Sequence, residues 1–206
     1  MSDNATELSL IDTRVARLFA LVTEALAGAT YTLLNGGIAA AQTIMHGDQA
    51  IDDLTDEVVA MVWKQIESTT TRREELRHLV NLLLIVPELE RSADLAEHIA
   101  TRAAANLGVA MSPVSRGYVQ RMSEVALVMW RATADAYNER SIGGVVLDEA
   151  DEEIDILHDR LTVEVAAESM PTAVASEVTL IGRFYERLGD HAVNIARRIG
   201  TLADTE

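Results

Sequence analysis

The sequence predicts an all-α protein made of two tandem three-helix bundles. Apolar residues recur at intervals of three and four along almost the whole chain of 206 residues, and sustained alternation with a period of two is absent. Breaks rich in glycine, serine, threonine and proline divide this pattern into six segments. The third and sixth segments also share much of their sequence, which indicates an internal duplication.

Long apolar stripes predict the first two helices. One stripe runs from Leu8 to Leu33 and stops at Asn35-Gly36-Gly37, a combination that typically ends a helix. The next stripe runs from Ile44 to Ile66 and stops in the polar segment Ser68–Thr71. We therefore expect two consecutive helices in this part of the chain.

Capping motifs predict where the third and fourth helices begin. Thr71-Arg72-Arg73-Glu74 has the pattern of a capping box and is expected to open the third helix. This helix carries apolar residues from Leu76 to Ile99 and is expected to end near Asn106-Leu107-Gly108. Ser112-Pro113 then predicts the start of the fourth helix, because serine caps helices well and proline is tolerated at the first helical position.

Glycine and proline separate the last three predicted helices. The fourth carries apolar residues from Val119 to Met129 and is expected to break at Gly143-Gly144. The fifth carries apolar residues from Ile154 to Val165 and ends at Ser169-Met170-Pro171. The sixth runs from Val174 to Leu202.

A direct alignment of the two halves supports the duplication. The segment Leu84–Ala100 lies over Leu180–Ala196 without a gap and with many identical positions. The segment Gly47–Asp52 matches Ala150–Asp155 more loosely. We therefore predict two repeats of three helices each, over residues 1–108 and 112–206.

The charge and the composition exclude several classes of function. The formal net charge is −16 and no basic patch is present, so nucleic acid is a poor partner. Cysteine is absent, so any metal ion has to be held by oxygen or imidazole ligands. The polar N-terminus does not resemble a signal peptide, and the most apolar stretch, Leu79–Val86, is far shorter than the roughly 20 residues that span a bilayer. These features predict a soluble protein without membrane insertion.

Four pairs of acidic residues recur at matching positions in the two halves. The two acids of a pair are four residues apart, so they share one helix face about a turn apart. Like charges so placed repel each other by roughly a few tenths of a kcal/mol unless a cation lies between them. Because neighbouring helices run antiparallel, we expect two such rows to converge in each half into a site for Mg²⁺, Mn²⁺ or iron. The candidate ligands are Asp48, Asp52, Glu90 and Asp94 in the first half and Asp151, Asp155, Glu186 and Asp190 in the second.

Acid pairs also occur on ordinary solvated helix faces, so a second interpretation treats them as surface features. Arg91 lies three residues before Asp94, and Arg187 lies three residues before Asp190. At this spacing each arginine can form an ion pair with the acid within its helix. Three histidines near the acids are candidate ligands as well, although packed or hydrogen-bonded histidines are the commoner case. They are His98, His158 and His191.

The sixth predicted helix resembles a known family. The stretch Phe184–Arg198 is similar to the signature helix of the PhoU family, the bacterial regulators of phosphate uptake and of phosphate-responsive signalling. The segment Glu74–Asp94 resembles the matching helix of the first repeat, and Asp151–Leu157 resembles the family's fifth helix. With two three-helix repeats in about this length, the resemblance covers nearly the whole chain.

The resemblance implies a function and a set of ligands. Family members are cytoplasmic negative regulators that bind a membrane sensor histidine kinase and the ATPase of the phosphate ABC transporter, often as homodimers. Their acidic motifs, which correspond to the eight acids named above, can hold iron, zinc, magnesium or manganese. The first repeat departs from the pattern, with Arg91-Ser92-Ala93 inside its motif and Pro87 within its helix. Because proline removes a helical hydrogen bond and tends to bend the helix, we expect the first acidic site to be the more distorted.

Two other functions stay open at this point. The first is a carboxylate-bridged metal protein, such as an iron store or an oxidase, built in a helix bundle. That class usually needs Glu-x-x-His pairs, and only Asp155-Ile156-Leu157-His158 comes close. The second is a purely structural dimerisation bundle. Because no glycine-rich phosphate loop or nucleophile elbow is present, the sequence predicts a protein that is not an enzyme.

Overall fold

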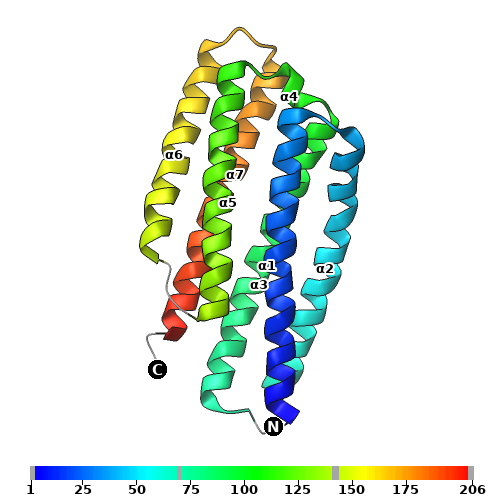
Figure 1. Cartoon of the computed structure of the whole chain (residues 1–206), viewed down its shortest axis with the longest axis vertical. Coiled ribbons are helices and arrows are strands. Elements are labelled where there is room, and N and C mark those ends of the chain that lie inside the picture. The colour runs from blue at the N-terminus through cyan, green and yellow to red at the C-terminus, as the bar shows by residue number, and fades with distance from the viewer. Residues whose placement is uncertain (1–2, 69–70, 141–143, 204–206) are drawn as a thin grey trace.

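The computed structural model of the chain describes residues 3–68, 71–140 and 144–203, and every regular element in these ranges is an α-helix (Figure 1). The predicted all-α class is therefore confirmed. The helices are α1 (Asp3–Asn35), α2 (Ile38–Ile66), α3 (Arg73–Ala104), α4 (Leu107–Ala110), α5 (Pro113–Glu139), α6 (Gly144–Ala167) and α7 (Thr172–Ala203).

The six long helices form two three-helix bundles side by side (Figure 1). Within the first bundle α1, α2 and α3 pack on one another, and α5, α6 and α7 do the same in the second. The bundles meet through α1 against α5 and α3 against α7, so these four helices form the centre of the molecule. Helices α2 and α6 cover opposite outer sides, which confirms the predicted pair of tandem three-helix bundles.

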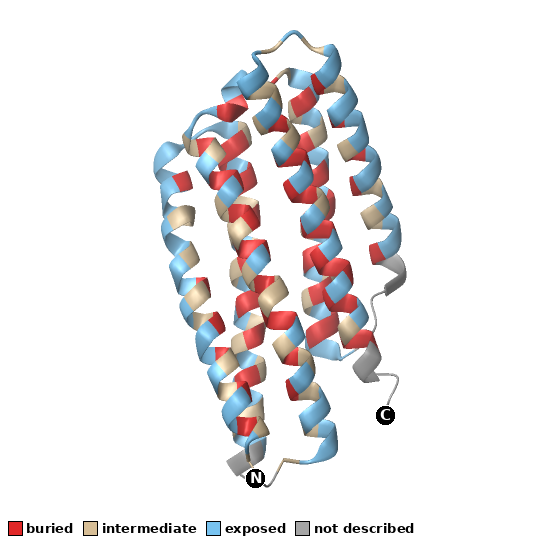
Figure 2. Cartoon of the chain, turned by 180° about the vertical axis from the view of Figure 1, so that it is seen from behind, coloured by how far each residue is buried: buried red, intermediate tan, exposed pale blue. Residues whose placement is uncertain are grey.

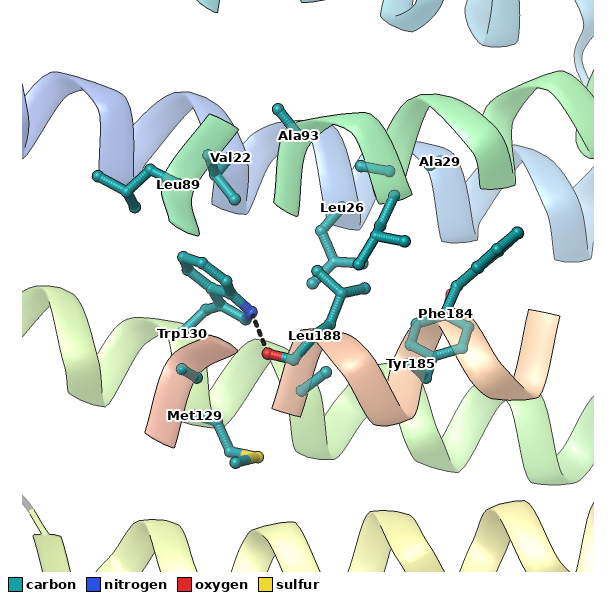
Figure 3. Packing of buried hydrophobic residues seen from close by; sticks show 14 of the residues in the cluster. Val22, Leu26, Ala29, Leu89, Ala93, Met129, Trp130, Phe184, Tyr185 and Leu188 are labelled. Carbon is teal, nitrogen blue, oxygen red and sulfur yellow. Dashed lines mark hydrogen bonds between the residues drawn. The ribbon is translucent and has the colours of Figure 1, made fainter. Parts of the chain in front are cut away.

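The core lies where the four central helices meet (Figures 2 and 3). Its largest side chains include Trp130, Phe19 and Tyr185, which are at most 1% exposed. Burying a large apolar side chain of this kind stabilises a fold by roughly 1.5–3 kcal/mol. The indole Nε1 of Trp130 donates a hydrogen bond to the backbone oxygen of Leu188 at 3.2 Å, which joins α5 to α7 (Figure 3).

A buried group of hydroxyls holds the two repeats in register. The Tyr185 hydroxyl lies 2.5 Å from Oγ1 of Thr30, and Oγ of Ser123 donates to the same Thr30 oxygen at 3.0 Å. Burial raises the pKa of Tyr185 to about 12, so its hydroxyl stays neutral and suits the core. These hydrogen bonds link Tyr185 of α7 to Thr30 of α1, and Thr30 to Ser123 of α5.

The helix boundaries agree with the sequence in part. Gly36 and Gly37 both have positive φ angles, as the predicted end of the first helix requires. Oγ of Ser112 accepts a hydrogen bond from the backbone N–H of Ser115 at 3.1 Å, so the predicted cap of the fourth helix is confirmed. The predicted break at Gly143-Gly144 differs, because Gly144 already belongs to α6 and Gly143 lies outside the described residues.

One detail of the third helix was predicted wrongly. Its cap is Arg72, whose backbone N–H donates to Glu75 at 2.9 Å, one position beyond the predicted Thr71–Glu74 box. The helix ends at Ala104, close to the predicted end near Asn106-Leu107-Gly108, and the short helix α4 follows it. Asn106 takes the left-handed conformation that ends α3, and Gly108 is needed for close packing, because a Cβ there would lie 1.7 Å from a backbone oxygen of α1.

Helix α1 passes a simple test for a membrane span. Over Ala5–Asn35 it is long and apolar enough to cross a bilayer by length and composition alone, and it is longer than the apolar stretch singled out in the sequence. Its side chains Val15, Leu18, Val22 and Leu26 are fully buried among the other helices. This burial is typical of a core helix.

Candidate metal centre

The eight predicted acids lie on two pairs of neighbouring helices, each made of an outer and a central helix. Asp48 and Asp52 are on α2 and face α3, which carries Glu90 and Asp94. In the second repeat α6 and α7 carry the corresponding acids. Because α2 and α3 are joined by a short connection, they run antiparallel, and so do α6 and α7. In the first repeat the carboxylates of Asp48, Asp52 and Asp94 approach one another, and in the second Asp190 lies close enough to Asp151 to raise its pKa.

The first acidic cluster, defined as Asp48, Asp52, Glu90 and Asp94, is closely assembled. One carboxylate oxygen each of Asp48, Asp52 and Asp94 lies within 4.8 Å of the other two. Helix α3 continues through Pro87, so the proline does not interrupt the helix that carries Glu90 and Asp94. The expected distortion of this site therefore does not keep its acids apart.

The negative charges of the first acidic cluster repel one another and are partly buried. Burial raises the pKa of Asp48 to about 6, with further increases from the negative charges of Asp52, Asp94, Glu97 and Glu90. The pKa values of Asp52 and Glu90 are raised for the same reasons, burial first and then the neighbouring acids. Oδ1 of Asp48 is buried and has no hydrogen-bond partner among the described residues. A cation would relieve both the repulsion and the missing contact.

The donor atoms of the first acidic cluster fit a hard metal ion. All are carboxylate oxygens, which magnesium and manganese prefer and which iron accepts. Three oxygens that close to one another can reach a single ion, and Glu90 is near enough to raise the repulsion on Asp48. The arrangement can thus bind a divalent or trivalent cation at the protein surface.

The second acidic cluster, defined as Asp151, Asp155, Glu186 and Asp190, has two arginines beside it. Burial raises the pKa of Asp151 to about 6, Asp155 and Asp190 add to the increase, and Arg197 opposes it. Glu186 forms an ion pair with Arg183 one turn earlier in α7. Among the described residues, only the first acidic cluster brings three ligand oxygens within 4.8 Å of one another.

The sequence difference between the clusters follows from the alignment of the repeats. Arg183 aligns with Pro87 and Arg197 with Thr101, so the first repeat lacks both arginines. Instead it has Glu97, an additional acid that raises the pKa of Asp48. Sequence reasoning missed Glu97, although its position seven residues after Glu90 places it on nearly the same helix face.

The three candidate histidines are engaged elsewhere. Nδ1 of His191 lies 2.8 Å from Oγ of Ser92, and burial lowers the pKa of this histidine. The ring of His98 packs on Phe184 with centroids 5.7 Å apart. The ring of His158 lies against Gly182, whose missing side chain leaves room for it. These contacts favour packing between helices over a role as ligands.

Fold and site together define a class of protein: an all-α chain of two repeated three-helix bundles with acidic clusters between the outer and central helices of each bundle. The family model described as the PhoU domain matches residues 15–103 and 119–199, once in each repeat. The chain belongs to the PhoU family.

Solved structures and curated relatives agree with this assignment. The crystal structure of PhoU from Pseudomonas aeruginosa superposes with a TM-score of 0.89 at 20% identity, covering 98% of this chain and 99% of the other. The phosphate transport system regulatory protein PhoU from Streptococcus pneumoniae superposes with a TM-score of 0.84 at 19% identity, covering 99% and 98%. At this identity both show the fold alone.

Among curated proteins, the phosphate-specific transport system accessory protein PhoU homolog of Rhizobium meliloti is 28% identical over 98% of this chain and 88% of its own length. The PhoU homolog 2 of Mycobacterium tuberculosis is 27% identical over 94% of this chain and 92% of its own length.

Proposed function

We propose that this chain is an accessory regulator of phosphate transport in the cytoplasm. It acts as a negative regulator of phosphate uptake and of phosphate-responsive two-component signalling when phosphate is plentiful. The observation that carries the proposal is the match of both repeats to the PhoU domain. Relatives aligned over most of their length and named as phosphate-specific transport system accessory proteins support it.

In this function the chain works by binding other proteins and not by catalysis. Its partners are a membrane sensor histidine kinase and the ATPase of the phosphate ABC transporter, and it forms a homodimer. The outer helices α2 and α6 each leave one side exposed to solvent, which is compatible with docking (Figure 2). The strongly negative charge of the chain favours basic surfaces on the partners.

The first acidic cluster is the proposed metal site. Asp48, Asp52 and Asp94 supply ligand oxygens to Mg²⁺, Mn²⁺, Zn²⁺ or iron, and Glu90 completes the set. The short distances among the carboxylates and the unpartnered oxygen of Asp48 support this assignment. Asp151, Asp155, Glu186 and Asp190 form a second, weaker site, because Arg183 and Arg197 already supply counter-charges there.

The alternative is a carboxylate-bridged metal protein that stores iron or activates oxygen. The closely spaced carboxylates favour it. The position of the acids does not, because such centres lie in the core of a four-helix bundle. Here the acids lie on an outer helix and a central helix of a three-helix bundle, and His158 of the Asp155–His158 motif packs on α7. Oxygen consumption on adding ferrous iron to the purified chain would favour this alternative.

A gene deletion tests the proposed function. In phosphate-rich medium, a strain lacking the gene is expected to express phosphate-starvation genes, measured with an alkaline phosphatase reporter. The wild-type gene should restore repression, and so should the control variant Asp135→Asn, which changes an exposed acid on α5 away from both clusters. Normal repression in the deletion strain would contradict the proposal.

A further inference from the structure

A cleft lies between the repeats at the end of the molecule where α1 and α3 begin. It encloses about 740 Å³, within the range of roughly 300–1,000 Å³ typical of small-molecule sites. One wall is a face of α1 with the first turns of α3, and the other is formed by the ends of α5 and α7. Helices α1 and α3 extend beyond the end of α5, which leaves this face of α1 partly uncovered.

The floor of the cleft is organised by one carboxylate. Oδ1 of Asp12 accepts hydrogen bonds from the Tyr137 hydroxyl at 2.8 Å and from Nε2 of His78 at 2.7 Å, and Oδ2 lies 3.4 Å from Nη2 of Arg140. Burial alone would raise the pKa of Asp12, but these contacts outweigh it and lower the pKa. Asp12 is therefore ionised and already engaged by side chains of α3 and α5.

Three arginines and three acids line the cleft, so its formal charge balances, but two of the acids, Asp12 and Glu75, are already engaged by neighbouring side chains. Arg77 lines the cleft and has no ion pair or hydrogen bond to another described residue. Among the described residues, the Arg140 guanidinium contacts Asp12 alone, at 3.4 Å, which leaves most of its five N–H donors available. Glu75 is occupied by Arg72, whose Nε and Nη2 both donate to it. Glu74 is the one other acid in the lining.

The lining also contains apolar groups. Leu8 and Ala16 of α1 contribute to it, together with Ile199 of α7 and the ring of Tyr137. A bare inorganic ion would leave these walls in contact with water, and a purely apolar molecule would leave the guanidinium groups unused. A molecule that joins an apolar body to an anionic group would contact both the apolar walls and the guanidinium groups.

We infer that this cleft binds a small organic anion in which a phosphate or a carboxylate is attached to an apolar body. The planar guanidinium groups of Arg77 and Arg140 match the geometry of such anions. The apolar body lies against α1, Ile199 and Tyr137. Because the lining comes from both repeats, an occupied cleft stabilises their contact and raises the melting temperature.

A pair of matched fluorescent probes tests the inference on the full chain. The probe 1-anilinonaphthalene-8-sulfonate has an aromatic body and an anionic group, and 1-anilinonaphthalene has the same body without the charge. We expect the sulfonate to bind at one site per chain and the uncharged probe to bind much more weakly. Arg77→Glu should weaken sulfonate binding roughly tenfold or more through the loss of charge-assisted hydrogen bonds, and Arg77→Lys should retain most of it.

Controls and competitors make the test decisive. Arg160→Ala, which changes an exposed arginine of α6, should bind the sulfonate like the wild type. Displacement by AMP would identify a phosphate as the preferred group, and displacement by benzoate would identify a carboxylate. Equal binding of the two probes, unchanged binding in Arg77→Glu, or no displacement by either competitor would overturn the inference.

Discussion

Asp48→Asn is expected to stabilise the metal-free protein at neutral pH. Folding raises the pKa of Asp48 from 3.8 to about 6, so the folded chain holds this proton more tightly than the unfolded chain does. The ionised side chain therefore destabilises the fold above pH 6, and the penalty is lost as the pH falls towards 3.8. At 1.36 kcal/mol per pKa unit the penalty is at most about 3 kcal/mol. Because Asp48 is only partly buried, water screens the repulsion and we expect about 1–2 kcal/mol.

Urea denaturation with a chelator present measures this effect. At pH 7.5 Asp48→Asn should have a free energy of unfolding about 1–2 kcal/mol above the wild type, and the gain should fall to about a third by pH 4.5. Adding Mn²⁺ should stabilise the wild type and not the variant. The control Asp135→Asn should stay within about 0.5 kcal/mol of the wild type. A destabilised Asp48→Asn, or a gain that is independent of pH, would refute the electrostatic reasoning.

Three further substitutions, one of them with a matched glycine control, test the packing and the second cluster. Gly108→Ala should lower the free energy of unfolding by about 3 kcal/mol or more, because its Cβ would collide with a backbone oxygen of α1. Gly117→Ala, which has open space around its Cβ, should be neutral or stabilising. Equal urea midpoints for the two variants would contradict this. Tyr185→Phe should lower the free energy of unfolding by about 1–2 kcal/mol by removing a buried hydrogen bond to α1, and an unchanged value would count against that contact. Arg197→Thr should tighten Mn²⁺ binding beside Asp151 roughly fivefold, measured by calorimetry. The reason is that it removes a positive charge whose repulsion of the cation is worth about 1 kcal/mol in water. Weaker binding in the variant would show that Arg197 does not oppose the metal.

Much of the fold follows from local patterns in the sequence. Helical periodicity identified six long helices, and glycine or serine marked ends that the structure confirms at Gly36, Gly37 and Ser112. The features that the sequence missed depend on packing. The short helix α4 was not predicted, its Gly108 is required by contact with α1, and the cap of α3 lies one residue later than its motif.

The candidate site was predicted in its outline and not in its details. Spacing alone placed the acids on facing helix surfaces, because the period of a helix is fixed. The difference in charge between the two clusters depends on which other side chains lie close to the acids. Arg197 acts on Asp151 and Glu97 acts on Asp48, each from a different helical turn. Pro87 was expected to weaken the first cluster; the helix continues through it, and it occupies the position of an arginine in the second repeat.

The proposed metal site lies between the two antiparallel helices α2 and α3. An anomalous difference map from a crystal of the wild-type chain soaked in Mn²⁺ tests it most directly. We predict a peak about 2.0–2.3 Å from carboxylate oxygens of Asp48, Asp52 and Asp94, absent from crystals of Asp48→Asn/Asp94→Asn. Equal occupancy in that double variant, or manganese found only away from these three residues, would contradict the account.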